Sequence, residues 1–361
     1  MSDLPLLPAI PDDLAAAALH GSWCPKLCNH ACPVLAATGR DDAVPWSLHR
    51  TVSDLATGRL EPDDRAAARL TACSGCLGCQ EPCTFDQDVP AQVRAGRAAT
   101  AGAGAPVPGH DAAVAAVSAG TSPHGVPRAD GVAPGATAGA TAVLVGCRDT
   151  PDVVAALLAL LRAAGEDAVA VAPAGCCGAT LRDLGAVPAA DAARDATAGA
   201  LTGAARVVLL DPHCAPEAAA AVADDVEVVH AVEAVWRHLE AGAITLRADL
   251  GPATYHDPCL LARDARLVEE PRTLLRTAGA ELVEPEHHGP DVACAGGGLA
   301  LPLVDPGAAE ATADRRRGHL AATGAPLVVT ACAGARERLA ADGSAVADLF
   351  TVLAERLVSE A

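Results

Sequence analysis

The stretch Cys73-Ser74-Gly75-Cys76-Leu77-Gly78-Cys79-Gln80-Glu81-Pro82-Cys83 places four thiols in the spacing C-x2-C-x2-C-x3-C. Loops this short let the first three thiolates reach neighbouring atoms of one polynuclear metal cluster, while the fourth reaches elsewhere. The chain has 14 cysteines in 361 residues, seven between Cys24 and Cys83 and seven from Cys147 onward. A secreted disulfide scaffold is shorter and denser in cysteine, so this grouping indicates metal or redox chemistry.

A second cysteine run, Cys24-x3-Cys28-x3-Cys32-Pro33, lies upstream of the first. The downstream run has the spacing of bacterial-type [4Fe-4S] ferredoxins, in which the fourth cysteine of a run ligates the cluster of the other run. That pattern gives one complete ligand set, named here the four-cysteine set: Cys32, Cys73, Cys76 and Cys79. It also gives an incomplete set, the three-cysteine set: Cys24, Cys28 and Cys83.

The three-cysteine set lacks a fourth thiolate because the upstream run has three cysteines where the pattern has four. Its fourth ligand could be a non-cysteine group such as the nearby His30, or the site could hold a three-iron or labile cluster. A zinc site is the alternative, since paired C-x2-C motifs also bind zinc. Zinc usually takes two pairs and not a run of four, so the spacing favours iron–sulfur clusters.

From Thr141 onward, strand and helix patterns alternate, which predicts parallel α/β units. The cysteines of this part repeat in order: Cys147, Cys176-Cys177-Gly178 and Cys214, then Cys259, Cys294-Ala295-Gly296 and Cys332. The offset from 176 to 214 equals that from 294 to 332, at 38 residues. Most of these cysteines follow an expected strand, and the carboxyl ends of strands are where open α/β sheets bind ligands. The repeat therefore predicts a duplicated ligand-binding module.

The predicted architecture is multidomain and combines α+β with α/β structure. A small, mainly helical ferredoxin-like domain is followed by two duplicated α/β modules with parallel sheets. The length of 361 residues suits two or three domains. The predicted boundaries are 1–100 for the ferredoxin-like domain, 101–140 for a linker rich in Ala, Gly and Pro, 141–248 for the first module and 249–361 for the second.

Adjacent cysteines before a glycine indicate a polynuclear cluster. Two thiolates on successive residues cannot easily face one tetrahedral ion, but they can hold different atoms of a cluster, with the glycine relieving backbone crowding. The first module offers four thiols, the first-module set: Cys147, Cys176, Cys177 and Cys214. In the second module Ala295 replaces the second cysteine, which leaves the second-module set: Cys259, Cys294 and Cys332. His256 is a candidate fourth ligand there, against a structural role in its turn, and a metal-free second module is the further alternative.

The whole layout resembles the D-type iron–sulfur subunits of heterodisulfide reductases and their relatives, the iron–sulfur subunits of glycolate oxidase, anaerobic glycerol-3-phosphate dehydrogenase and lactate-oxidation complexes. The resemblance is carried by Cys73–Cys83, Gly175–Gly178, Tyr255–Leu260, Cys294–Gly298 and Val328–Cys332. It implies [4Fe-4S] clusters, two in the ferredoxin-like domain and one in the first module, with a further one in the second module in question. It also implies electron transfer between an FAD-containing dehydrogenase or oxidase subunit, which carries the active site, and an acceptor such as a quinone or another membrane carrier.

The chain departs from the heterodisulfide reductases at the end of each module. Those modules end in C-x2-C, whereas Glu217 follows Cys214 at that spacing and Ala335 follows Cys332. The missing thiols disfavour thiol–disulfide reduction at the adjacent cysteines, which stays the alternative function, and they favour an electron conduit. The sequence carries no Walker or flavin motif, so any flavin is expected on another chain.

The charge and the apolar runs narrow the setting of the protein. Its formal net charge of −19 repels phosphate backbones, so a nucleic-acid partner is not expected. Residues Met1–Ile10 lack the basic start and long apolar core of a signal peptide. The longest strongly apolar run, Val153–Leu161, is far shorter than the ~20 residues that span a bilayer. These patterns predict a cytoplasmic protein that can also lie peripherally on the inner face of a membrane.

Overall fold

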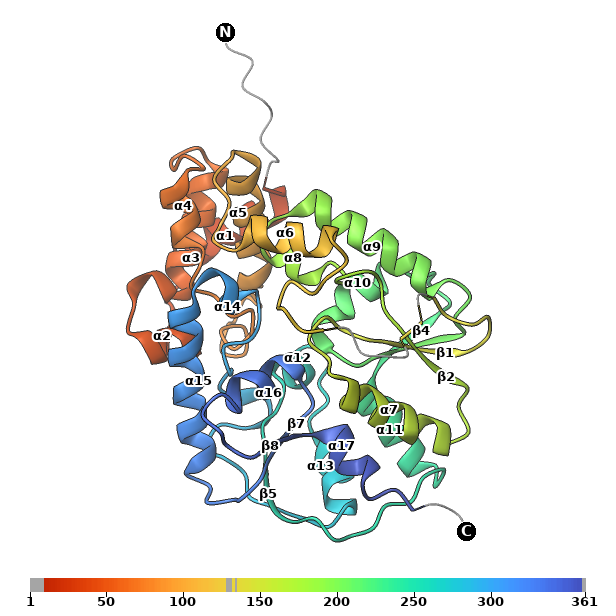
Figure 1. Ribbon diagram of the computed structural model, residues 1–361. Helices are drawn as coiled ribbons and strands as arrows, with labels where there is room; N and C mark the ends of the chain where they lie inside the picture. Colours follow the sequence, from red (N-terminus) through yellow and green to blue (C-terminus); the bar gives the residue numbers. More distant parts are fainter. Residues whose placement is uncertain (1–9, 128–131, 134, 359–361) are drawn as a thin grey trace. The chain divides into compact units, whose positions relative to one another are not determined.

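The computed structural model describes residues 10–127, 132, 133 and 135–358. Two compact units share the chain, and each is built from several segments. The first unit comprises the described residues up to Val114, with Thr180–Ala189 and Ala293–Arg316. The second unit comprises the described residues of Ala115–Ala179, of Ala190–Val292 and from Arg317 onward. The first unit is helical, and both sheets lie in the second (Figure 1).

The first unit is built around three helices that pack against one another: α1 (Asp12–Gly21), α3 (Pro45–Ala56) and α5 (Val89–Gly102). Leu48 and Val52 of α3 and Val93 of α5 are fully buried between these helices, together with Leu70. Short elements complete the unit: η1 (Leu27–Ala31), α2 (Pro33–Thr38), η2 (Asp41–Ala43), α4 (Asp64–Arg69), α14 (Leu301–Val304) and most of α15 (Pro306–Ala321). The cysteines of this unit therefore lie on loops and short helices that surround a three-helix core.

Side-chain caps define where the helices around the cysteine loop begin. Asp63 accepts hydrogen bonds from the amides of Arg65 and Ala66 and so starts α4. Asp88 accepts from the amide of Ala91 and starts α5. Each cap satisfies backbone donors that a helix leaves unpaired at its amino end and is worth about 1 kcal/mol. The Asp88 cap thereby fixes the end of the loop 70–88, where it enters α5.

The first sheet of the second unit is wholly parallel, with strand order β2-β1-β3-β4. Its strands are β1 (Thr141–Leu144), β2 (Ala168–Val171), β3 (Arg206–Leu209) and β4 (Glu227–His230). Helices α7 (Pro151–Ala163), α9 (Val187–Leu201), α10 (Ala215–Ala219) and α11 (Ala231–Glu240) follow its strands. Val143 pairs in register with Ala170 and Val208 and is fully buried, as expected for a parallel sheet covered on both faces.

The second sheet is also parallel and has the corresponding order β6-β5-β7-β8. Its strands are β5 (Gly251–Tyr255), β6 (Ala280–Leu282), β7 (Val328–Thr330) and β8 (Val346–Asp348). Its helices include α12 (Cys259–Arg263), α13 (Glu269–Thr277), α16 (Ala333–Leu339) and α17 (Leu349–Ala354). The prediction of parallel α/β structure from Thr141 onward is confirmed. The duplication, the ferredoxin-like domain and the domain boundaries stay predictions.

A continuous apolar core joins the two sheets of the second unit. Helices α7, α11, α13 and α17 pack together and bring side chains such as Leu157, Val235, Leu274 and Phe350 into one buried cluster (Figure 1). Burial of a side chain of this size contributes about 2 kcal/mol, so this cluster is the main stabilising element of the unit. Within the described parts of the chain, no helix is long and apolar enough to cross a membrane.

Part of the predicted linker, residues 101–140, is helical. Helix α6 spans His110–Ser118, and β1 begins at Thr141. Residues 128–131 and 134 of the predicted linker lie outside the described residues. Residues 120–122, 126 and 127, which follow α6, line a cavity beside the cysteines of the first sheet.

Candidate functional site

The structure brings the members of the four-cysteine set together in the first unit. Cys32 directly precedes α2, and the other three cysteines lie on the loop between α4 and α5. The pKa of Cys32 is raised to about 12, mainly by burial, with contributions from the thiols of Cys76 and Cys73. Burial also raises the pKa of Cys79 well above its usual value, and the nearby Cys76, Cys73 and Cys32 add to it. Four thiols that raise one another's pKa in this way occupy one small, buried space.

The backbone of the cysteine loop is shaped by close contacts with a segment distant in sequence. Gly75 has φ +64°, and a Cβ at this position would lie 2.9 Å from Cβ of Leu299. A Cβ at Gly298 would lie 2.4 Å from the carbonyl oxygen of Ser74. The glycines therefore allow the segment that follows Cys294 to pack directly against the loop that carries Cys73 and Cys76.

A buried cation, Arg97 of α5, ties this arrangement together. Its guanidinium donates to four carbonyl oxygens of three chain segments: Leu70 at 2.9 Å, Asp183 at 2.7 Å, Leu299 at 2.9 Å and Thr71 at 3.5 Å. Burial lowers the pKa of Arg97 to about 10, while the thiol of Cys73 raises it. Arg97 therefore stays charged at neutral pH and places a fixed positive charge near the four-cysteine set.

A second cation lies on the same helix. Arg94 forms an ion pair with the buried Asp183, with Nε 2.7 Å from Oδ1. The pKa of Cys73 rises to about 11 because of its burial, and both Arg97 and Arg94 act against that rise. The electrostatic surroundings of the four-cysteine set are thus cationic, which favours a bound group that carries negative charge.

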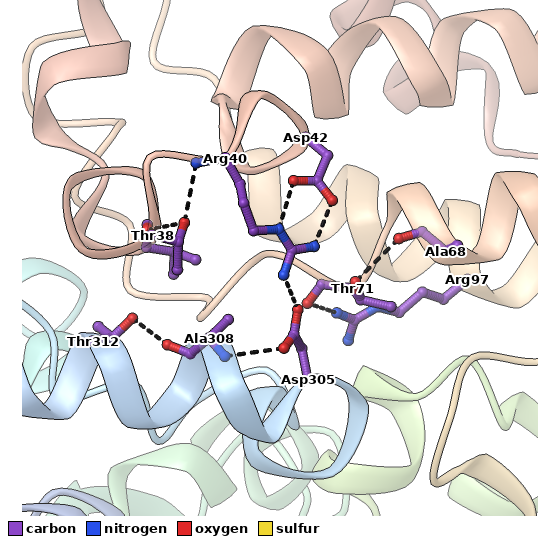
Figure 2. A network of polar contacts seen from close by, with 10 residues as sticks. Thr38, Arg40, Asp42, Ala68, Thr71, Arg97, Asp305, Ala308 and Thr312 are labelled. Atoms are coloured by element: carbon purple, nitrogen blue, oxygen red, sulfur yellow. Dashed lines mark hydrogen bonds and ion pairs between the residues drawn. The ribbon is translucent and has the colours of Figure 1, made fainter.

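A polar network joins the segment that follows Cys32 to the start of α15 (Figure 2). Arg40, between α2 and η2, donates Nε to Asp42 at 2.9 Å and also pairs with Asp305. Asp305 accepts from the amide of Ala308 at 3.0 Å and so caps the start of α15. The segment that follows Cys32 is thereby joined to α15, and the thiol of Cys32 donates to the carbonyl oxygen of Ala43 at 3.5 Å.

The three-cysteine set also assembles, nearer to the surface. The pKa of Cys28 is raised to about 11, mainly by burial, with contributions from the thiols of Cys24 and Cys83. Cys28 is buried, whereas Cys24 and Cys83 are partly exposed. His30, the candidate fourth ligand, lies exposed on η1. A role of His30 as the fourth ligand of this site stays a prediction.

The first-module set converges at the carboxyl edge of the first sheet. Cys147 follows β1, Cys176 and Cys177 follow β2, and Cys214 ends the short helix η3 (Pro212–Cys214) after β3. The thiol of Cys177 donates to that of Cys214 across 3.1 Å. A hydrogen bond with Cys176 raises the pKa of Cys147, and burial raises it further.

The glycine that follows the adjacent cysteines serves their packing. Gly178 has φ +108°, and a Cβ there would lie 2.8 Å from the carbonyl oxygen of Ala190 in α9. Its amide donates to the sulfur of Cys176 at 3.4 Å. A side chain at this position would be strained and would push the turn away from α9, so the sequence Cys-Cys-Gly is required by the local geometry.

Buried carboxylates surround the first-module set, and sequence reasoning missed them. Asp149 accepts from the amide of Gly146 at 2.7 Å, and Asp211 caps η3 through the amide of His213 at 2.9 Å. Burial raises the pKa of Asp149 well above its usual value, and the charges of Asp211 and Asp348 contribute. Asp149 and Asp211 each lie within three residues of a cysteine, which was the available signal.

A cavity of about 220 Å³ opens beside two of these thiols. Its walls include Cys147 and Cys176 from the sheet edge, Asp149, and Ser122 from the segment after α6. Ser122 donates its hydroxyl to the carbonyl oxygen of Cys147 at 2.6 Å and so joins this segment to the cysteine. The cavity has room for a small molecule in contact with sulfur.

Members of the second-module set are divided between the two units. Cys259 starts α12 and Cys332 caps α16, both in the second unit, whereas Cys294 belongs to the first. Burial raises the pKa of Cys332 to about 12, and the charge of Asp211 raises it further. This set, and with it the role of His256 as ligand or structural residue, stays a prediction. His256 itself is buried, and its amide donates to the carbonyl oxygen of Val329 at 2.8 Å.

The turn that leads to Cys259 is locked by a buried ion pair. Both guanidinium nitrogens of Arg272 reach Asp257, at 2.7 and 2.9 Å, and the same side chain pairs with Glu284 at 2.8 Å. Asp257 also accepts from the amide of Gly289 at 2.8 Å. A bidentate pair of this kind fixes the turn and leaves no buried charge without a counterion.

None of the fourteen cysteines, all of which lie in described parts of the chain, forms a disulfide. Within those same parts, no group of three or more His, Cys, Asp or Glu side chains is arranged to hold a single metal ion.

Parts of this chain are similar to known proteins. A family model described as a cysteine-rich domain, CCG, matches residues 253–335, which include all three cysteines of the second-module set. A protein of Chromohalobacter salexigens, described as a probable membrane-anchored ferredoxin, is 37% identical over 106 residues. That match covers 27% of this chain and 16% of the relative, so the chain corresponds to about a sixth of the relative's length.

Proposed function

We propose that this chain is an iron–sulfur electron-transfer protein and a subunit of a larger oxidoreductase. The observation that carries the proposal is the convergence of Cys32 with Cys73, Cys76 and Cys79, two regions some forty residues apart, in one buried space beside a cation. The similarity to a ferredoxin and to the cysteine-rich domain family supports the same role.

The donor chemistry suits iron–sulfur clusters. Thiolates are the ligands of such clusters, and buried thiols with raised pKa values lose their protons when a cationic metal centre binds. The four-cysteine set and the first-module set would each hold a [4Fe-4S] cluster, and the three-cysteine set a second cluster of the first unit. A bound cluster would accept and release a single electron. The protein's own residues would exclude water from it and fix its charge surroundings, which set the reduction potential.

The partners follow from the same proposal. An FAD-containing dehydrogenase or oxidase subunit would carry the active site and exchange electrons with this chain. A quinone or another membrane carrier would take them further, which suits a peripheral position at the inner face of a membrane. Among the relatives of the D-type heterodisulfide reductase proteins, the glycolate oxidase type of iron–sulfur subunit fits best, because Glu217 and Ala335 stand where a fifth thiol would be needed.

One observation favours a second candidate, a thiol–disulfide reductase. The cavity of about 220 Å³ exposes Cys147 and Cys176 to a small molecule, as a disulfide substrate would require. The buried Glu217 on α10, which replaces a thiol of the reductase pattern, counts against it. Turnover of a small disulfide by the isolated protein would favour this candidate over the electron conduit.

The first experiment is anaerobic purification followed by analysis of iron, acid-labile sulfide and zinc. The proposal expects roughly eight to twelve iron atoms per chain, with EPR signals of reduced [4Fe-4S] clusters after dithionite treatment. About four iron atoms would mean that one set alone is occupied. Zinc without iron would contradict the proposal and favour a structural metal site.

A further inference from the structure

Large apolar side chains gather at the surface beside the three-cysteine set. Among the described residues, six large apolar side chains are exposed, and four of them belong to this region. They form the Trp23 patch: Leu19 at 43% exposure, Trp23 at 75%, Leu27 at 53% and Phe85 at 49%. Exposed apolar side chains that cluster in this way mark interaction sites more often than those scattered singly.

The Trp23 patch surrounds the thiols because of how the chain is routed. Trp23 and Leu27 each precede a cysteine of the set directly, and Phe85 follows Cys83 by two residues. The ring of Phe85 packs on that of His20, with centroids 4.2 Å apart, so it lies next to Leu19 at the end of α1. The members of the patch and the cysteines of the set therefore alternate along the same two stretches of the first unit.

The loop that presents Trp23 is held firmly in place. Trp46 of α3 donates its indole nitrogen to the carbonyl oxygen of Ser22 at 2.6 Å, and Lys26 places its ammonium 4.0 Å from the centroid of the same ring. Ser22 in turn donates its hydroxyl to the carbonyl oxygen of Ala18 at 2.8 Å. A patch fixed beforehand loses less conformational freedom when a partner binds.

Acidic side chains flank one side of the patch. Glu81, Asp86 and Asp88 are exposed and lie within four residues of Phe85 in sequence. Within the loop 22–28, which carries Trp23 and Leu27, the basic side chain is Lys26. The chain as a whole carries a net charge of −19. An apolar centre with an acidic rim matches a partner whose apolar face is rimmed by Lys and Arg.

We propose that the Trp23 patch is the docking surface for an electron-transfer protein whose redox centre lies beneath an apolar, basic-rimmed face. This inference rests on the proposed function. One electron leaves one protein and enters the other, so the partner is the oxidant or the reductant, and no bond forms or breaks. Transient redox complexes have small interfaces, often below about 1,200 Å², with energy concentrated in residues such as Trp. A small patch directly beside a set of thiols suits such a complex.

Two other occupants fit less well. An anionic lipid surface attracts basic segments and would be repelled by Glu81, Asp86 and Asp88. A second copy of this chain would present the same acidic rim to itself across a two-fold axis, which sets like charges against each other. Both occupants can be tested alongside the proposed one.

The test uses the purified, cluster-containing full chain and cytochrome c, a small basic redox protein, as the probe. The variants are Trp23→Gln and Phe85→Ser, and the matched control is Val283→Gln, an exposed apolar residue of the second unit. Each photoreduced protein is mixed with cytochrome c in a stopped-flow instrument, and separately with benzoquinone, which needs no docking. Iron content and EPR spectra show whether each variant keeps its clusters.

The expected result is a rate constant with cytochrome c that falls about tenfold or more in Trp23→Gln and Phe85→Ser, as for loss of a binding hot spot. The rate with benzoquinone and the rates of Val283→Gln should stay unchanged. Asp86→Asn should slow the reaction at low salt, and added salt should slow the wild type. Should Trp23→Gln lose iron, Phe85→Ser carries the test, because its side chain lies outside the loop 22–28.

Equal cytochrome c rates in wild type and both patch variants would overturn the docking inference while leaving the proposed function intact. A dimer that dissociates in the patch variants would assign the patch to a second copy. Cosedimentation with phosphatidylglycerol vesicles that is lost in those variants would assign it to a membrane. A wild-type protein without iron would instead overturn the proposed function itself.

Discussion

The four-cysteine set and the first-module set each offer four thiols, but different charged groups act on them. Arg97 and Arg94 lie near the first, and both oppose the rise in the pKa of Cys73. Near the second, the hydrogen bond from Cys177 lowers the pKa of Cys214, but burial and the charges of Asp211 and Asp149 raise it, to about 11. Two cations thus act on the four-cysteine set, whereas two carboxylates and one cation, Arg148, which lowers the pKa of Cys147, act on the first-module set.

This difference bears on what each site can do with an electron. Reduction adds a negative charge, which a neighbouring guanidinium stabilises and a neighbouring carboxylate opposes. We therefore expect the four-cysteine set to hold the more readily reduced cluster. We expect the first-module set to hold a cluster of lower potential, whose reduction draws protons onto nearby carboxylates. Four thiols with different charged neighbours would then give the two clusters of one chain different reduction potentials.

The largest expected effect comes from removal of one thiol from each set. Cys76→Ala and Cys176→Ala should each lower the iron content by about four atoms per chain, because each removes one of the four thiolates that would hold a [4Fe-4S] cluster. EPR redox titration of the two variants then assigns one potential to each set. Ser74→Ala, in the same loop as Cys76, is the control and should keep its iron. The comparison fails if the cluster that remains in Cys76→Ala is the one of higher potential.

Arg97 offers the next largest effect. Arg97→Met leaves four buried carbonyl oxygens without their donor, and each unsatisfied group costs about 1–3 kcal/mol, so we expect the free energy of unfolding to fall by about 3 kcal/mol or more. Loss of the charge should also make the potential of the four-cysteine cluster more negative, by about 59 mV for each 1.4 kcal/mol. Urea unfolding and EPR titration measure the two effects.

Arg97→Lys separates those two contributions. Lysine keeps the charge but cannot reach several carbonyl oxygens in a planar fork, so the stability should fall while the potential stays close to that of the wild type. A potential that shifts equally in Arg97→Lys and Arg97→Met would show that geometry, and not charge, distinguishes the two sites.

A smaller effect is expected where the segment after Cys294 packs on the cysteine loop. Gly298→Ala would bring a methyl group within 2.4 Å of the Ser74 carbonyl oxygen, and relief of such overpacking typically costs about 1–3 kcal/mol. Gly307→Ala, in α15 of the same unit, is the matched control. A Cβ at Gly307 would lie 3.7 Å from its nearest neighbour, Oδ1 of Asp305. Alanine there should stabilise α15 by up to about 1 kcal/mol. Thermal unfolding of both variants decides whether the packing is as tight as the distances indicate.

Sequence patterns could predict the cysteine sets more readily than the charges around them. The run of cysteines and the alternation of strands and helices are local signals; the parallel α/β structure is confirmed, and the ligand sets stay predictions. Arg97 gave no such signal, because an arginine within an ordinary helical stretch is usually exposed and its burial depends on segments up to two hundred residues away. The same holds for Asp348, which reaches the surroundings of Asp149 only through the packing of the two sheets.

The smallest effect concerns pH and the carboxylates of the second unit. Burial raises the pKa of Asp348 to about 7, against an ordinary value of 3.8. The folded state then binds a proton that the unfolded state has lost, so stability contributed by this group is present at low pH and is lost as pH rises from about 4 through 7. For one group the slope cannot exceed about 1.4 kcal/mol per pH unit.

Asp348→Asn should remove this slope while keeping the cap on α17, because an amide oxygen can still accept from the amide of Phe350, now at 2.8 Å from Oδ1. Urea unfolding at pH 5, 6, 7 and 8 should show the variant gaining on the wild type as pH rises. The potential of the first-module cluster should rise as well, since one negative charge near Asp149 is gone. An unchanged stability difference across these pH values would mean that Arg336 holds Asp348 ionised, and the anionic side of the comparison would then rest on fixed charges and not on protons.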